Sequence, residues 1–267
     1  MKVKKAVIPA AGLGKRFYPL TRSQPKEMLP IVDKPVIHYV VEEAVKSGLD
    51  EILIIVGKGK DAIINYFDKT NTYADLEKDY KIDDFPNIYF IRQKEQLGLA
   101  DAIRYAKGFV DDDPFAVLLG DTIYRSSSPL TVTQQLIKVY SKHNSPAIAV
   151  EEVPKDKIKD YGIIDGNKIS DKLWLINNLV EKPQIQNAPS NIGITGAYIL
   201  ESDIFGYIDK IKTGINNEYQ LTDALKRLCK DRDLLGYKFE GKRYDIGTKE
   251  LWIKTFLEFS KESGYIG

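Results

Sequence analysis

The sequence predicts an α/β fold built on a doubly wound, mixed and mostly parallel β-sheet. Short apolar stretches alternate with amphipathic ones through the first half of the chain, which is the pattern of strand–helix–strand units. Residues 51–56 (EILIIV) are almost continuously apolar, as expected for a strand buried on both faces. After Pro146 the apolar stretches become shorter and are separated by turn signals, which indicates a smaller β region beside the main sheet.

The longest element of the first half is the helix expected at residues 33–47. Asp33 can cap this helix, Pro35 suits its first turn, and Gly48 follows it in the position that glycine prefers after a helix. The same periodicities predict strands at 5–10, 51–56, 87–92 and 115–119, and further helices at 60–67 and 99–107.

The second half is expected to carry more strands than helices. Segment 70–86, which precedes it, is polar and acidic without clear periodicity and is predicted to be an exposed excursion. No repeat or low-complexity linker divides the chain, so we expect one domain over residues 1–267, with halves of about 1–125 and 126–267. Strands are predicted at 147–153, 161–164, 174–180 and 192–200, and helices at 218–230 and 250–261.

The composition excludes several classes of protein. A formal charge of +1 gives no overall attraction to nucleic acid or to an anionic membrane, so neither is an expected partner. The single cysteine excludes an internal disulfide framework, and two histidines give little support to a histidine-dependent hydrolase or metal site. There is no apolar run of about 18 residues, and Pro9 and Gly12 interrupt the amino-terminal apolar stretch, so we expect a cytoplasmic protein.

A glycine-rich stretch, AAGLGKR, directly follows the first predicted strand. Glycines let the backbone approach a ligand closely, and free N–H groups in such a turn can bind phosphate oxygens. A Walker loop would need Ser or Thr where Arg16 stands, and a dinucleotide fingerprint would need a third glycine where Phe17 stands. On this stretch alone, a phosphate-binding loop and an ordinary glycine turn with a basic edge remain about equally supported.

Charged residues after other predicted strands point to chemistry at phosphorus. Asp121 follows the strand at 115–119, at the edge where open α/β sheets place their ligands. A carboxylate there can hold Mg²⁺, which prefers oxygen ligands and shares them with phosphates. Asp245 lies in a second acidic turn, and Lys26 adds a positive charge that suits a triphosphate. Each of these residues could equally serve in a surface turn if taken in isolation.

From residue 5 to about residue 259, the chain resembles the sugar-phosphate nucleotidyltransferase family, most closely its bacterial uridylyltransferases that act on UTP and glucose 1-phosphate. The matching segments are AAGLGKRFYPLT, PKEMLPIVDKPVIHYVVEEA, QKEQLGLADAI, GD, VEKPQIQNAPSN, EYQLTDAL and YDIG. The glycine-rich start and the Glu-Lys-Pro are common to the whole family, whereas PKEMLP, APSN and EYQLTDAL favour the uridylyl branch. The resemblance implies a Rossmann-like nucleotidyltransferase fold with a sugar-binding β region in the second half.

The resemblance also implies roles for residues at the matching positions. Arg16 and Lys26 should bind the triphosphate, while Asp121 and Asp245 should share Mg²⁺. The nucleotide should be held by Ala10, Ala11, Gly12, Gly14, Glu27, Gln93 and Gly98, with Glu27 on the ribose and with Gln93 and Gly98 on the base. The sugar phosphate should be held by Gly162, Glu181 and Lys182. Relatives commonly assemble as homodimers or homotetramers, so a homo-oligomer is expected.

Three departures from the uridylyl pattern keep the choice of substrate open. Lys15-Arg16 replaces the usual Thr-Arg, FYPLTRSQ is closer to the thymidylyl branch, and Gly196-Ala197-Tyr198 lacks a common central arginine. A thymidylyltransferase or a broad-specificity relative is therefore an alternative. A non-catalytic sugar-nucleotide-binding subunit is another, although such a protein is expected to have lost the acidic or basic groups retained here. A nicotinamide oxidoreductase is disfavoured because Val56-Gly57-Lys58 offers no acidic residue at the end of the second strand.

Overall fold

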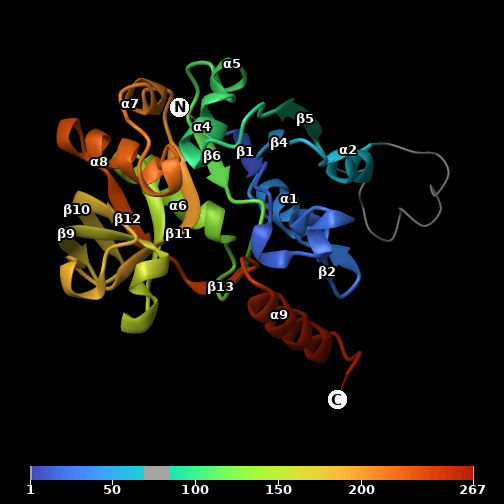
Figure 1. The fold of residues 1–267 in the computed structure, drawn as a ribbon. Coiled ribbons are helices and arrows are strands. Elements are labelled where there is room, and N and C mark those ends of the chain that lie inside the picture. Colours follow the sequence, from blue (N-terminus) through green and yellow to red (C-terminus); the bar gives the residue numbers. More distant parts are fainter. Residues whose placement is uncertain (1, 69–84, 267) are drawn as a thin grey trace.

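The computed structural model describes residues 2–68 and 85–266, and its centre is one mixed β-sheet of nine strands (Figure 1). Most of segment 70–86, the predicted excursion, lies outside the described residues. The strands of the sheet are β1 (Lys5–Ala10), β4 (Glu51–Val56), β5 (Asn87–Arg92), β6 (Phe115–Leu118), β8 (Ala147–Glu152), β9 (Gly162–Ser170), β10 (Leu173–Glu181), β11 (Ile192–Leu200) and β12 (Leu235–Lys238).

The strand order is β5-β4-β1-β6-β11-β8-β12-β10-β9. The first four strands are parallel to one another, β11 is antiparallel to both β6 and β8, β12 is parallel to β8, and β10 is antiparallel to β12 and β9. Seven strands therefore run one way, and β11 and β10 run the other way. This arrangement is the mixed, mostly parallel sheet that the sequence predicts, and it continues without a break from the first half of the chain into the second.

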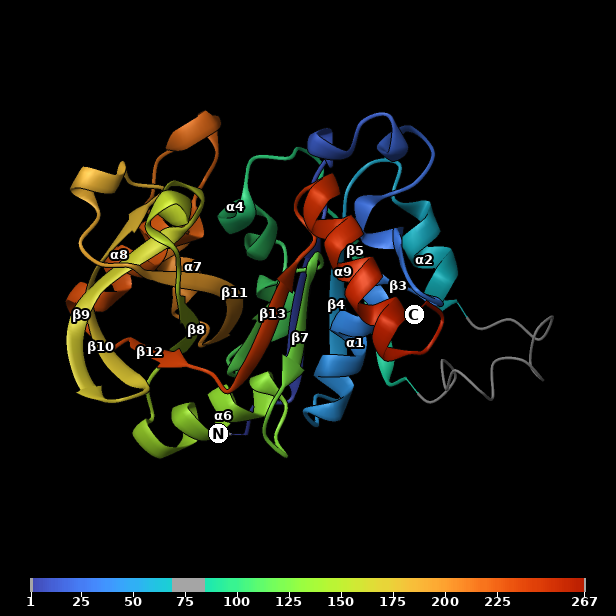
Figure 2. The same cartoon turned by 90° about the horizontal axis from the view of Figure 1, so that it is seen from below.

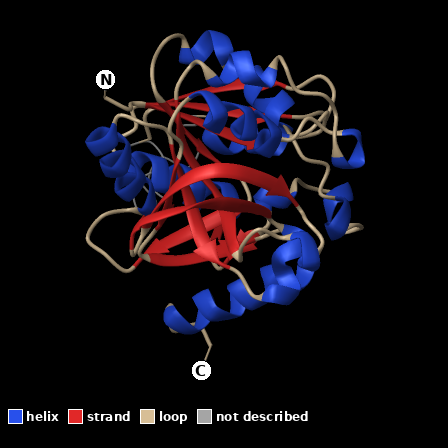
Figure 3. Ribbon diagram, turned by 90° about the vertical axis from the view of Figure 1, so that its left-hand side faces the viewer, coloured by secondary structure: helices blue, strands red, loops and turns tan. Residues whose placement is uncertain are grey.

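Helices cover both faces of the sheet, which makes it doubly wound (Figure 3). Alternate side chains of a strand point to opposite faces, so on β1 the side chain of Val7 packs in one apolar layer while Ala6 and Ile8 pack in the other. The layer around Val7 contains α4 (Leu99–Arg104), α7 (Ile204–Ile208) and α8 (Leu221–Asp231), and the opposite layer contains α1 (Val36–Lys46), α2 (Asp61–Phe67) and α6 (Val132–His143).

Two short antiparallel pairs and the last helix lie beside the main sheet. Figure 2 shows one pair, β7 (Thr122–Ser126) with β13 (Gly241–Asp245), between the two halves of the molecule and next to α9 (Lys249–Glu262). The other pair joins β2 (Pro30–Ile31) to β3 (Lys34–Pro35), and α9 packs on β2 as well as on β13. In the described part of the chain, no helix is both long and apolar enough to cross a bilayer.

Three helices have bounds in the structure that differ from the predicted ones, because backbone N–H and C=O groups near their ends form hydrogen bonds other than those of a continuous α-helix. The helix predicted from Asp33 begins at Val36, whose N–H donates to the carbonyl of Leu29 while residues 34–35 form β3. The helix predicted at 99–107 is divided into α4 and α5 (Lys107–Val110), because Tyr105 and Ala106 make i to i−3 bonds. The helix predicted from residue 218 begins at Leu221 instead.

Candidate active site

The glycine-rich stretch forms the turn that leaves the carboxyl end of β1. Ala10 and Ala11 are buried and Gly12 is exposed. Gly14 has a φ of 64° at the start of a short 3₁₀ helix, Lys15–Phe17, and a Cβ there would lie 2.8 Å from Cγ2 of Thr21. Glycine therefore suits this position both for its conformation and for space. The 3₁₀ helix carries Arg16, which is exposed to solvent.

Lys26 and Asp121 form an ion pair at the carboxyl edge of β1 and β6. Lys26 begins the 3₁₀ helix Lys26–Met28, and Asp121 directly follows the turn after β6. Burial alone would lower the pKa of Lys26, but the charges of Asp121, Glu27 and Asp245 raise it instead. The ammonium group is therefore held in its charged form among carboxylates, at the edge of the sheet where ligands of α/β folds bind.

Glu27 is 1% exposed and accepts a hydrogen bond of 2.6 Å from Nζ of Lys60, which is also buried. Burial raises the pKa of Glu27 and lowers that of Lys60, while the attraction between the two charges opposes both shifts. The pair connects the loop after β4 to the loop that carries Lys26. The predicted contact of Glu27 with a ribose stays a prediction, since its carboxylate is bonded to Lys60 here.

Asp245 reaches the same edge through the β7–β13 pair. Asp245 lies opposite Thr122 in the register, and the N–H of Ile246 donates to the carbonyl of Asp121 at 2.9 Å. Burial raises the pKa of Asp245, and the charge of Asp121 raises it further against the opposing effect of Arg243. The two predicted metal-binding aspartates, which are far apart in the sequence, are thus neighbours in the fold.

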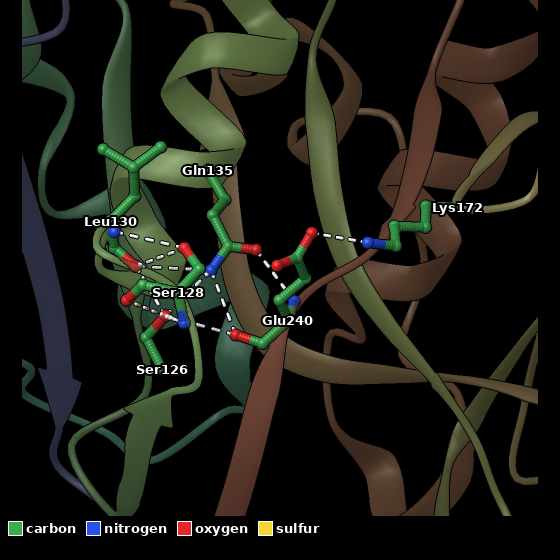
Figure 4. Close-up of polar contacts among 6 residues, drawn as sticks. All are labelled: Ser126, Ser128, Leu130, Gln135, Lys172 and Glu240. Atoms are coloured by element: carbon green, nitrogen blue, oxygen red, sulfur yellow. Dashed lines mark hydrogen bonds and ion pairs between the residues drawn. The ribbon is translucent and has the colours of Figure 1, made fainter.

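A cluster of polar side chains fixes the far end of this strand pair (Figure 4). The amide of Gln135 on α6 accepts from the N–H of Glu240 at 2.8 Å and donates to its carbonyl at 3.1 Å. The hydroxyl of Ser126 donates to the carbonyl of Leu130 at 2.5 Å, and Lys172 forms an ion pair with Glu240 at 2.5 Å. The bonds between Gln135 and Glu240 hold the β12–β13 turn against α6, at the end of β13 opposite to Asp245.

The residues around Asp121 fit a divalent metal ion that is shared with phosphates. Among residues 2–68 and 85–266, no group of three or more acidic, histidine or cysteine side chains is placed to enclose a metal by itself. Mg²⁺ commonly takes only one or two carboxylates and completes its shell with water and substrate phosphates. Asp121 and Asp245 supply two such carboxylates, and their mutual repulsion would be relieved by a bound cation.

The segment predicted to read the base follows β5. Gln93 is buried, and its amide nitrogen donates to Asp101 at 2.7 Å and to the carbonyl of Gly98 at 3.4 Å. Arg104 in turn donates to Asp101 at 3.3 Å. Because the amide nitrogen already has two protein acceptors, the amide oxygen is the atom that Gln93 can offer to a ligand. Asp101 therefore orients the predicted base-reading residue.

Gly98 also joins the two halves of the chain. Its φ is 105°, and a Cβ there would lie 2.7 Å from the carbonyl oxygen of Tyr219. Residues near Gly98 bond to the same segment: the N–H of Tyr219 donates to the carbonyl of Leu97 at 2.7 Å, and the N–H of Ala100 donates to the carbonyl of Tyr219 at 3.0 Å. The QKEQLGLADAI and EYQLTDAL segments thus pair through their backbones, which is why α8 starts at Leu221.

The predicted sugar-phosphate residues also come together in the structure. Gly162 at the start of β9 lies opposite Glu181 at the end of β10. Oε2 of Glu181 accepts a hydrogen bond of 2.6 Å from the hydroxyl of Thr222 on α8. A Cβ on Gly162 would lie 3.1 Å from Oε2 of Glu181 and 3.1 Å from the hydroxyl oxygen of Thr222. The Nζ atom of Lys182 lies 3.4 Å from the other oxygen of Glu181. A side chain at position 162 would therefore crowd this carboxylate and hydroxyl, and glycine avoids the contact.

Arg243 connects the two parts of the site. It is two residues before Asp245 on β13, so both side chains are on the same face of the strand. Arg243 donates to Glu151 at 2.9 Å and to Asp245 at 3.3 Å, and it also donates to the hydroxyl of Tyr161. Since Tyr161 directly precedes Gly162, one buried guanidinium group links a predicted metal ligand to the predicted sugar pocket.

Four residues that hold the predicted site residues in place were not predicted from the sequence. Three of them have a sequence signal: Thr222 lies within a matching segment, Asp101 lies in the first turn of a helix, and Arg243 lies two positions from Asp245 on a strand. Lys60 has no such signal, because only the fold brings it to Glu27. The four residues are Lys60, Asp101, Thr222 and Arg243.

The sequence profile of the nucleotidyl transferase family matches residues 5–262. The chain belongs to this family. Family membership confirms the resemblance found in the sequence and identifies the chain as a nucleotidyltransferase. The α/β fold class is confirmed as well, because solved members of the family superpose on the described fold.

Curated members of the family include close relatives. The UTP–glucose-1-phosphate uridylyltransferase of Staphylococcus epidermidis is 45% identical over 269 residues, which cover 97% of this chain and 93% of that protein. A crystal structure of a UDP-glucose pyrophosphorylase complexed with UDP-glucose has a TM-score of 0.92 and 39% identity, covering 97% and 99% of the two chains. A UTP-bound enzyme of the same type from Acinetobacter baumannii has a TM-score of 0.87 and 34% identity, covering 97% and 94%.

Proposed function

We propose that this nucleotidyltransferase joins UTP to glucose 1-phosphate and forms UDP-glucose and pyrophosphate. The observation that carries the proposal is the position of Asp121 and Asp245, whose backbones are adjacent, with Lys26 paired to the first and Arg243 to the second. The names of the relatives, which cover nearly the whole chain, support the choice of substrates.

In the proposed reaction, an oxygen of the sugar phosphate attacks the α-phosphorus of UTP in line with the leaving group. A new P–O bond forms, the bond between the α-phosphorus and the bridging oxygen breaks, and pyrophosphate leaves with the electron pair. A phosphate monoester has a second pKa near ~6, so the nucleophile is already largely ionised at neutral pH. The site therefore requires no general base, which agrees with a reaction that depends on alignment and charge.

The residues of the chain have separate tasks in this proposal. Arg16 and Lys26 bind the triphosphate, and Lys182 binds the sugar phosphate while Glu181 binds sugar hydroxyl groups. Asp121 and Asp245 would hold Mg²⁺, which would reduce the repulsion between the two anionic substrates. Arg243 keeps Asp245 and the start of β9 in a fixed relation, so that the two substrates meet at the correct distance.

The amide oxygen of Gln93 can accept a hydrogen bond from the N3–H of uracil or thymine, so its orientation is compatible with either base. This contact does not distinguish UTP from dTTP, and FYPLTRSQ resembles the thymidylyl branch. A thymidylyltransferase therefore remains the alternative to be tested.

The other expectations are part of the same proposal. We expect one domain over residues 1–267, and the central sheet, which contains strands from both halves, supports this expectation. A homodimer or homotetramer and a cytoplasmic location remain predictions.

The deciding experiment is to measure pyrophosphate release with UTP, dTTP, ATP, CTP and GTP in turn, using glucose 1-phosphate and Mg²⁺. A clear preference for UTP with UDP-glucose as the product is expected. Equal or better use of dTTP would contradict the uridylyl assignment, but the proposed type of reaction, nucleotidyl transfer to a sugar phosphate, would still hold. If no nucleotide and no alternative sugar phosphate gave release, the non-catalytic binding subunit would replace the enzyme.

A further inference from the structure

A basic pocket lies on the outer side of α8, where this helix faces the end of α7. Its volume is about 570 Å³. Helices α7 and α8 pack against each other (Figure 1). One wall of the pocket is a single face of α8, formed by residues three and four positions apart, and the opposite wall consists of the end of α7 and the loop after it, residues 210–213. None of its lining residues belongs to the candidate active site described above. We call it the α7–α8 pocket.

The charge of the α7–α8 pocket is unusual for this chain. Two carboxylates, Asp223 and Asp231, oppose five cations, so the pocket has a formal charge of +3, whereas the whole chain has only +1. The remainder of the chain therefore has a formal charge of −2, and positive charge is concentrated here. The five cations are Lys210, Lys212, Lys226, Arg227 and Lys230.

These cations have few partners within the protein. Over residues 2–68 and 85–266, none of them forms a salt bridge, although Nζ of Lys210 lies 5.7 Å from the ring centre of Tyr207. The hydroxyl of Tyr207 donates to Asp231 at 3.0 Å, so one of the two opposing carboxylates is already engaged. Unpaired cations that repel one another around a hollow are stabilised when an anion enters it.

We infer that the α7–α8 pocket binds a small molecule with two or more phosphate groups, separately from the nucleotide and sugar phosphate of the active site. The volume lies within the usual range of small-molecule sites, roughly 300–1,000 Å³. Arginine and lysine on successive turns of one helix can contact several phosphate oxygens at once. A concave site of this size suits a small molecule better than a nucleic acid or a protein surface.

The first turn of α8 connects this pocket to the candidate active site. Thr222, whose hydroxyl bonds to Glu181, directly precedes Asp223 in the pocket wall. Burial and the charge of Glu181 raise the pKa of Asp223, while Lys226 and Arg227 lower it, so Asp223 interacts with both sites. An anion on Lys226 and Arg227 would cancel their effect and add negative charge near the sugar-phosphate site. Bound polyphosphate should therefore weaken binding of the sugar phosphate, an expectation that rests on the proposed function.

The binding test uses inorganic tripolyphosphate as the probe, with the active site saturated by UDP-glucose. Calorimetry would compare the wild type with Lys226→Ala/Lys230→Ala and with the control Lys138→Ala/Lys142→Ala. Both pairs are four residues apart on a helix, have no salt bridge within the described residues and remove two charges. We expect binding to the wild type and the control, and roughly 10-fold weaker binding to the α8 variant.

Equal affinity in all three proteins, or no binding to the wild type, would overturn the inference. ADP measured in the same way would distinguish a nucleotide ligand, which should bind more tightly than tripolyphosphate, from a simple polyphosphate, which should not. If a short RNA duplex bound this face and tripolyphosphate did not, the small-molecule assignment would be wrong.

A kinetic test examines the link to the active site. Tripolyphosphate should raise the KM for glucose 1-phosphate several-fold in the wild type and in the α6 control, and should leave it unchanged in the α8 variant. Binding without any change in this KM would support the α7–α8 pocket as a polyphosphate site and would refute its effect on the sugar-phosphate site. Calorimetry measures binding to the α7–α8 pocket and does not depend on turnover. Failure of the proposed function would appear in the pyrophosphate-release assay and would leave the calorimetric result unaffected.

Discussion

The first half of the chain uses close backbone contacts at two glycines in addition to buried side-chain pairs, whereas the second half holds its proposed site residues mainly through side-chain hydrogen bonds. In the first half, Gly14 and Gly98 have positive φ values and closely approach other parts of the chain. In the second half, Glu181 is held by Thr222, and Asp245 is held by Arg243. Gly98→Ala should therefore act through steric conflict, whereas Arg243→Lys and Thr222→Val should act through lost hydrogen bonds, and the predictions below compare these effects.

The largest effect is expected from Asp121→Asn, at the point where the two halves meet. The amide removes a charge from the proposed metal site and from the ion pair with Lys26. We expect kcat/KM to fall by roughly 10²- to 10³-fold, as when one electrostatic contact to a transition state is removed. Asp113→Asn, which alters a surface pair with Lys5, is the control. Near-normal turnover in a well-folded Asp121→Asn protein would contradict the assignment.

Gly98→Ala tests the backbone contact between the halves. The new Cβ would lie 2.7 Å from the carbonyl oxygen of Tyr219, at a φ of 105°. We expect the free energy of unfolding to fall by about 2 kcal/mol or more and the KM for UTP to rise, because strain and overpacking add. Gly59→Ala is the control, since Gly59 has a φ of 74° with nothing within 4 Å of a Cβ. Equal losses in the two variants would show that close approach is unimportant at Gly98.

Arg243→Lys tests the connection between the proposed metal ligand Asp245 and the proposed sugar-phosphate site. Lysine keeps the charge but cannot contact Glu151, Asp245 and Tyr161 together. We expect kcat/KM for glucose 1-phosphate to fall about 10-fold, the cost of one hydrogen bond to a charged group. Steady-state kinetics would be compared with Arg92→Lys, which alters an exposed pair. Unchanged kinetics would mean that Arg243 only stabilises the fold.

Thr222→Val should have a smaller and more selective effect. The change removes the hydroxyl that bonds to Glu181 and keeps the shape of the side chain. We expect the KM for glucose 1-phosphate to rise about 5-fold, equivalent to about 1 kcal/mol, with the KM for UTP unchanged. Thr133→Val is a matched control, because Thr133 is also a buried threonine near the start of a helix and lies outside the candidate site. An equal rise in both KM values would argue against a specific role in the sugar site.

Glu42→Gln should change stability without changing activity. Burial alone would raise the pKa of Glu42, but hydrogen bonds from His38, Lys34 and Lys46 lower it well below its usual range. A lowered folded-state pKa stabilises the protein above the unfolded value, near ~4.3, and this stabilisation is lost as the pH falls through the folded value.

We expect the wild type to be more stable than Glu42→Gln by about 1–2 kcal/mol at pH 7. Denaturant unfolding at several pH values should show the gap narrowing below about pH 4.3. A gap that stayed constant down to pH 3 would refute the explanation.

The accuracy of sequence prediction differs between elements with local signals and elements that depend on distant partners. The bounds of β1, β4, β5 and β11 match their predictions to the residue, because an apolar stretch specifies a buried strand locally. The pair β7 and β13 was not predicted, since each strand is short and partly polar and depends on a partner more than a hundred residues away. Helix α6 was missed too, although its capping box of Thr131 and Gln134 is a recognisable signal.

The same distinction applies to the candidate site. Glycines and charged residues in matching motifs could be named from the sequence, because their chemistry and spacing are local. The interactions of Lys60, Thr222 and Arg243 could not, because each is defined by a side chain that only the fold brings near. The sequence also did not indicate the α7–α8 pocket, whose cations come from two separate segments.

Strand β6 pairs with β11, which is synthesised later, so the order of synthesis matters for how this protein folds. All nine residues of β11 are buried, and it closes the edge of β6 on one side while pairing with β8 and β9 on the other. When the first half leaves the ribosome, β6 has an open apolar edge, and it stays open until residue 200 has emerged. Such an edge can pair with another nascent chain. We therefore expect the nascent chain to be open to association with other chains in the interval between the synthesis of β6 and the synthesis of β11.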